Sequence, residues 1–94
     1  MGRGTQLMLV DPMKLTKVAF SARKGDYILL SKEQCVKIFG RGALKRIAQY
    51  RKMLREGIPV PPVKLNRYGY IVDGAHRVLA AQQMGMPKIR VVKV

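Results

Sequence analysis

The sequence is poor in several residue types, and each shortage excludes a class of structure or chemistry. It has one cysteine, Cys35, so an internal disulfide cannot form. It also has one histidine, His76, so the usual Cys/His zinc sites cannot be assembled. Tryptophan is absent, and the aromatic residues are four tyrosines and two phenylalanines. A domain of this composition depends on an apolar core rather than on cross-links or a structural metal.

Acidic residues are scarce as well. Five Asp and Glu stand against 19 Lys and Arg, which gives a formal net charge of +14. So few carboxylates leave little material for a two-metal nuclease, which surrounds its ions with several acids. A strongly basic domain usually binds a polyanion. We therefore expect nucleic acid as a partner, with DNA favoured over RNA, and a homodimer is compatible with the sequence.

Long apolar runs are missing too. The longest have three or four residues, too few to cross a membrane, and the N-terminal Met1-Gly2-Arg3-Gly4 lacks the apolar stretch of a signal peptide. We therefore expect a cytoplasmic protein without membrane contact. The 94 residues, 48% of them apolar, fit a single folded domain over residues 1–94.

Apolar periodicity and turn residues predict an alternation of strands and helices. Ser31 and Gln34 fit a capping box before a helix, and Gly57 and Gly85 are typical helix stops. The prolines between residues 59 and 62 exclude a central strand before Val63. Strands are expected at 6–10, 17–22, 27–30, 63–66, 68–72 and 88–94, and helices at 32–39, 43–56 and 75–84. This order predicts an α+β domain with a small mixed β-sheet and about three helices.

A strand, a tight turn and a helix meet at Asp73-Gly74-Ala75-His76-Arg77. Gly74 lets the backbone approach a ligand closely, and the unpaired N–H groups of the first helical turn can hold an anion. Because the helix dipole disfavours the two cationic side chains there by about 0.3–1 kcal/mol each, a bound phosphate would reverse the sign of that interaction. The turn therefore predicts a phosphate or nucleotide site at Gly74, Ala75, His76 and Arg77. Asp73 and His76 are its candidate catalytic groups.

A purely structural interpretation of the same turn remains open. Asp73 has the right chemistry for a helix N-cap and the right spacing to pair with Arg77 four residues later. His76 would then be a satisfied polar residue beside the sheet.

A second basic segment precedes the predicted helix at 43–56. Two glycines, Gly40 and Gly42, stand near a group of cations, although the spacing is not that of a Walker motif. The group is a candidate contact for a nucleic-acid backbone, and the alternative is a solvated basic helix face. Its members are Arg41, Lys45, Arg46 and Lys52.

Basic residues continue along much of the chain, which favours a broad phosphate-binding surface with little sequence readout. Tyr68 and Tyr70 have the chemistry to stack on bases. Their spacing also places them on one face of a predicted strand, where packing against the core is the commoner role.

The stretch from Ile58 to Val94 resembles the ParB/sulfiredoxin superfamily. The matching features are Pro62-Val63, Tyr70-Ile71-Val72-Asp73-Gly74, His76-Arg77, Ala80-Ala81, Gly85 and the closing strand of Ile89, Val91 and Val92. The resemblance implies that the turn grips phosphate, with Gly74, His76 and Arg77 as ligands and Asp73 as a base or a contact to Mg²⁺. The implied cofactor is CTP or ATP with Mg²⁺.

The chain departs from the family pattern at Ala75. Sulfiredoxins have their catalytic cysteine there and ParB proteins a glutamate, so the thiol chemistry is absent and the basis for nucleotide hydrolysis is weakened. We also expect no sequence-specific centromere binding, because the helix-turn-helix that follows this domain in ParB proteins is missing. Three functions remain open: a nucleic-acid-binding module, a small nuclease, NTPase or phosphotransferase, and a regulatory protein that docks on an acidic partner.

Overall fold

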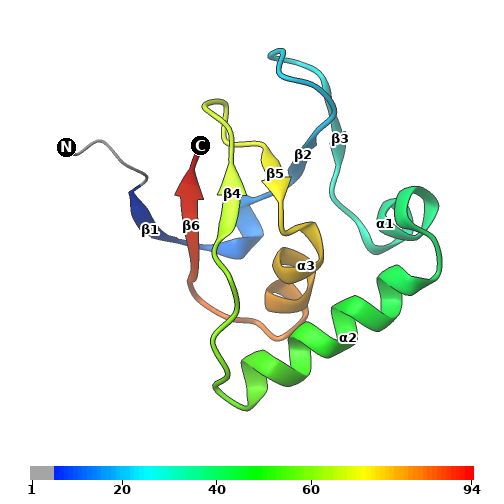
Figure 1. The fold of residues 1–94 in the computed structure, drawn as a ribbon, viewed down its shortest axis with the longest axis vertical. Helices are drawn as coiled ribbons and strands as arrows, with labels where there is room; N and C mark the ends of the chain where they lie inside the picture. The colour runs from blue at the N-terminus through cyan, green and yellow to red at the C-terminus, as the bar shows by residue number, and fades with distance from the viewer. Residues whose placement is uncertain (1–5) are drawn as a thin grey trace.

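In the computed structural model, residues 6–94 form six strands and three α-helices (Figure 1). Arg3 and the N-terminal segment in which we found no signal peptide lie outside these described residues. The strands are β1 (Leu7–Val10), β2 (Lys17–Ala19), β3 (Tyr27–Leu29), β4 (Val63–Leu65), β5 (Ile71–Asp73) and β6 (Ile89–Lys93). The helices are α1 (Lys32–Phe39), α2 (Gly42–Arg55) and α3 (Ala75–Gln83), with a short 3₁₀ turn η1 at Pro12–Lys14.

The strands form one mixed sheet in the order β1-β6-β4-β5-β2-β3. The pairs β4–β6 and β2–β5 are parallel, and the remaining pairs are antiparallel. The pairing of Val18 with Ile71 joins the first third of the chain to its last third. This architecture confirms the α+β fold with a small mixed sheet.

The core lies between the sheet and α3, and α2 packs on the other side of α3 (Figure 1). Val63, Ile71 and Val91 of the central strands are at most 2% exposed, and Val78 of α3 is fully buried against them. Alternation along β4 leaves Lys64 outside while its neighbours face inward. Cys35 belongs to this core, where burial raises the pKa of its thiol.

Local signals explain where the helices begin and end. The Ser31 hydroxyl accepts a hydrogen bond from the backbone N–H of Gln34 at 3.0 Å, which confirms the predicted cap of α1. Gly57 and Gly85, both with positive φ, follow the ends of α2 and α3 as predicted. Among residues 6–94, no helix has the length and hydropathy needed to cross a bilayer.

Two predicted strands are wrong in extent. The strand expected at 17–22 ends at Ala19, because Ser21 and Asp26 bond to each other and turn the chain into β3. The strand expected at 68–72 begins only at Ile71. Residues 66–70 form a turn instead, because Asn66 Oδ1 accepts from the N–H groups of both Tyr68 and Tyr70. Tyr68 and Tyr70 therefore do not share a strand face.

Candidate functional site

The predicted phosphate turn borders a cavity of about 360 Å³ at the beginning of α3. Four other elements contribute to its wall: β2, the end of α1, the middle of α2 and β5. The lining residues are Val18, Phe39, Arg46, Tyr50, Ile71, Val72, Asp73, Gly74, Ala75, His76 and Arg77. All five residues of the predicted turn therefore line one cavity.

Gly74 lines this cavity at the turn before α3. It is the N-cap of α3, with φ 107° and ψ 21°, a conformation that disfavours L side chains. A Cβ there would lie 3.1 Å from Arg77 Nη1 and 3.2 Å from Val63 Cγ2. Because the first helical hydrogen bond runs from Val78 N–H to the Gly74 carbonyl, the N–H groups of residues 75–77 have no acceptor within the helix. The interpretation of Asp73 as the N-cap is wrong, since it lies one residue too early.

Arg77 connects the turn to the segment that precedes β4. Its Nη1 donates to the carbonyls of Pro61 at 3.0 Å and Pro62 at 2.8 Å. Its Nη2 lies 3.3 Å from Asp73 Oδ2, which confirms the pairing at i, i+4, and its side chain is only 11% exposed. Nη1 and Nη2 of Arg77 thus bond within the protein, its Nε is buried without a partner among residues 6–94, and its charge remains at the cavity wall.

His76 is half-buried beside Phe39, with ring centroids 5.0 Å apart. Burial lowers the pKa of His76, and the positive charges of Arg46 and Arg77 lower it further. Its Nε2 is buried without a hydrogen-bond partner among residues 6–94. An anion in the cavity would supply a partner for this atom and offset the surrounding positive charge.

Arg46 comes from the second predicted segment and joins the turn at this cavity. It lies on the exposed face of α2, whereas Arg41, Lys45 and Lys52 are exposed elsewhere and do not line the cavity. The two basic segments that we predicted separately therefore meet through one residue. Sequence reasoning missed Phe39 and Tyr50, although Tyr50 lies four residues after Arg46 and so on the same helix face.

The carboxylate chemistry of the cavity is limited to Asp73. It is the one acidic residue in the lining, it is 54% exposed, and it pairs with Arg77. Between residues 6 and 94, no three His, Cys, Asp or Glu side chains are grouped so that they could hold a metal ion. Asp73 is thus the one lining residue with a hard oxygen ligand for a nucleotide-bound Mg²⁺.

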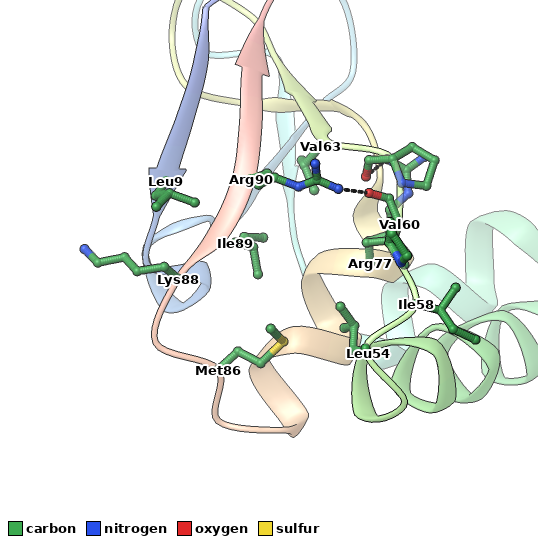
Figure 2. A pocket seen from close by; sticks show the side chains of 13 residues that line it. Leu9, Leu54, Ile58, Val60, Val63, Arg77, Met86, Lys88, Ile89 and Arg90 are labelled. Atoms are coloured by element: carbon green, nitrogen blue, oxygen red, sulfur yellow. Dashed lines mark hydrogen bonds between the residues drawn. The ribbon is translucent and has the colours of Figure 1, made fainter.

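A second cavity, of about 260 Å³, lies between the end of α2 and the beginning of β6 and is mainly apolar. Figure 2 shows Leu54, Met86 and Ile89 around it, with Arg90 reaching across to the Val60 carbonyl at 2.8 Å. Arg77 is the only predicted site residue in its lining. This groove therefore adjoins the predicted phosphate turn through Arg77 and is otherwise lined mainly by apolar residues.

Comparison with solved structures identifies the fold. A structure described as a Pnob8-like ParB-N domain matches 99% of this chain with a TM-score of 0.57 and 16% sequence identity. This chain spans 31% of the length of that chain. No family model matches the sequence, and no curated protein matches it. The likeness confirms the ParB-like fold.

Proposed function

We propose that this domain binds nucleic acid and holds a phosphate group, from a nucleotide or a nucleic-acid backbone, at the beginning of α3. One observation carries the proposal: free helix N–H groups, the Arg46 guanidinium and the unpartnered Nε2 of His76 line the same cavity. They are backbone N–H groups, a guanidinium from another helix and an imidazole nitrogen. Each is of the type that binds phosphate oxygens.

The proposed roles differ from residue to residue. The N–H groups of Ala75, His76 and Arg77 donate to the anion at the positive end of the helix dipole. Arg46, exposed and on another helix, supplies the cation that meets phosphate directly. Arg77 holds Asp73 beside the turn, which reduces repulsion between that carboxylate and the ligand. CTP or ATP with Mg²⁺ is the ligand class to test first.

Binding is favoured over turnover. Position 75 is alanine, which offers neither a nucleophile nor a carboxylate. Asp73, the one lining carboxylate, is paired with Arg77 rather than available as a base. The excess of basic residues then serves contact with phosphates along a nucleic acid.

The test combines thermal shift with amide NMR, because a ligand that binds only the folded state raises Tm. CTP, ATP and GTP with Mg²⁺ are added to the wild type, to Arg46→Ala and to Lys45→Ala. Lys45 neighbours Arg46 but lies outside the cavity lining, so it controls for the loss of one positive charge on α2. We expect one nucleotide to raise Tm in the wild type and Lys45→Ala, not in Arg46→Ala. The same nucleotide should shift the amide signals of residues 75–77. Equal Tm shifts in both variants, or unchanged amide signals, would contradict the proposal.

A further inference from the structure

A third cavity lies away from the phosphate turn and combines positive charge with aromatic rings. It has a volume of about 310 Å³ and is lined by three lysines, two tyrosines and apolar residues, with no Asp or Glu. The charged and aromatic members are Lys14, Lys17, Tyr68, Tyr70 and Lys93. They come from η1, β2, the β4–β5 turn and the end of β6. From this geometry we propose that the cavity and its rim bind single-stranded nucleic acid.

The aromatic rings at this end form a connected series. Tyr27 and Tyr70 have centroids 5.1 Å apart, and Tyr70 and Tyr68 are 5.7 Å apart. Cations lie among them: Lys17 Nζ is 5.0 Å from the Tyr27 centroid, and the Arg67 guanidinium is 5.2 Å from that of Tyr68. Three of the four tyrosines of the chain are thus interleaved with basic groups. This combination is typical of surfaces that bind phosphates and stack bases.

Of the two tyrosines that line the cavity, Tyr68 is the more exposed and is the ring that we propose for stacking, whereas Tyr70 supports it. Tyr70 is 7% exposed, and its hydroxyl accepts from the N–H of Gly25 at 3.1 Å, which fixes the β2–β3 hairpin against the cavity. Tyr68 is half-buried in the turn that Asn66 closes. Figure 1 shows the β4–β5 turn and the end of β6 at the same end of the sheet as this hairpin. A side chain held in position before binding loses less entropy when the ligand binds.

The charge of the lining decides between kinds of partner. Three ammonium groups around one cavity with no acid in its wall repel one another, and a polyanion removes that repulsion. An acidic protein would supply the charge, but its planar side chains do not repeat beside each charge as bases do beside phosphates. A duplex would supply phosphates, yet its base faces are covered by their neighbours. A single strand offers both phosphates and exposed base faces.

This inference rests on the nucleic-acid-binding part of the proposed function and not on the nucleotide site. The two sites use different residues, so their failures are distinguishable. If no nucleotide raises Tm in a way that depends on Arg46, the nucleotide site fails and the single-strand proposal is unaffected. If substitution of Tyr68 does not change single-strand binding, the single-strand proposal fails and the proposed site at the beginning of α3 is unaffected.

The experiment measures binding of a fluorescent oligodeoxythymidine of about 12 nucleotides by anisotropy at low salt, with a duplex of equal length as competitor. Tyr68→Leu removes the ring, and Tyr68→Phe keeps it. Since stacking contributes about 1–3 kcal/mol per base, we expect Tyr68→Leu to weaken single-strand binding about tenfold and Tyr68→Phe to restore it. Melting of each variant in the absence of DNA verifies the fold.

A second pair of variants tests the charge. Lys93 and Lys88 are both exposed and stand at opposite ends of β6, and only Lys93 lines the cavity. Lys93→Gln should weaken single-strand binding several-fold more than Lys88→Gln. Equal effects of the two, an unchanged affinity in Tyr68→Leu, or duplex competing as well as single strand would overturn the proposal.

Discussion

His76 is the residue whose environment makes the clearest prediction about pH. Burial and two nearby guanidinium groups hold its pKa below the 6.5 of an unfolded chain. The unfolded state therefore binds more protons than the folded state between that lowered pKa and 6.5, so stability increases with pH across this window. We expect the wild type to lose stability as the pH falls from 7.5 through 6.5, until His76 is protonated in the folded state too.

The measurement is urea unfolding at several pH values for the wild type and for His76→Gln, which does not titrate. The difference between the two stability curves isolates His76 from the carboxylates, which both proteins share. Curves that remain parallel from pH 7.5 to pH 5 would show that the environment of His76 does not shift its pKa.

Gly74 makes the second prediction at this scale, because its conformation and its lack of space act together. Gly74→Ala would put a Cβ 3.1 Å from Arg77 Nη1 and 3.3 Å from Val63 Cα, at a φ of 107°. Gly69→Ala is the matched control, with φ 81° but nothing within 4 Å of the added atom. We expect about 1 kcal/mol of destabilisation for Gly69→Ala and about 2–4 kcal/mol for Gly74→Ala, by urea unfolding. Equal losses would mean that close packing beneath the turn adds nothing.

At the scale of elements, one arginine joins the proline-rich entry to β4 with the beginning of α3. Arg77 donates from Nη1 to the carbonyls of Pro61 and Pro62 and from Nη2 to Asp73, and the single nitrogen of lysine cannot occupy both positions. Arg77→Lys should therefore cost about 1.5–3 kcal/mol in the free energy of unfolding, as expected for hydrogen bonds from a charged group. Arg90→Lys, which affects one exposed bond to the Val60 carbonyl, should cost less. A larger loss of stability in Arg90→Lys than in Arg77→Lys would mean that Arg90 of β6, and not Arg77, makes the main contact to the proline-rich segment.

Local signals predicted the elements better than the turns. The cap at Ser31, the stops at Gly57 and Gly85, and the delay of β4 until Val63 depend on neighbouring residues, and the structure confirms each. The turn at 66–70 depends on Asn66 accepting two backbone bonds. The sequence pattern did not predict this turn, because the spacing of Tyr68 and Tyr70 is also typical of a strand.

The site was only partly predictable, because part of it depends on contacts between residues far apart in the sequence. The residues of the α3 turn are contiguous, so their grouping was visible in the sequence. The arrival of Arg46 and Phe39 from other helices required the tertiary fold.

At the scale of the whole molecule, two cavities meet adjacent residues of the chain at β2 and at the beginning of β5. Lys17 and Tyr70 line the cavity that holds three lysines and two tyrosines. The next residues along the chain, Val18 and Ile71, line the cavity at the beginning of α3. Tyr70 ends the β4–β5 turn and Ile71 begins β5, and the pairing of Val18 with Ile71 holds these two parts of the chain side by side. A nucleotide in one cavity and a single strand in the other would therefore contact adjacent residues of β2 and of the chain that enters β5.

The net charge of +14 makes the last prediction, in which salt acts on folding and on binding with opposite signs. Self-repulsion of so many cations destabilises the compact state, and salt screens it, so Tm should increase as NaCl rises from about 20 to 300 mM. Over the same range, DNA affinity should fall, because each neutralised phosphate contributes about 0.7–0.9 to the slope of log K against log salt. KCl controls for a specific effect of Na⁺ and should give the same two trends. Sulfate at equal ionic strength should raise Tm more than chloride does, because it is excluded from protein surfaces and because it fits an anion site. Arg46→Ala should reduce that excess if the anion enters the cavity at the beginning of α3. A Tm that falls with NaCl would mean that exposed ion pairs outweigh repulsion. That outcome would conflict with a structure in which residues 6–94 hold the single ion pair of Asp73 with Arg77.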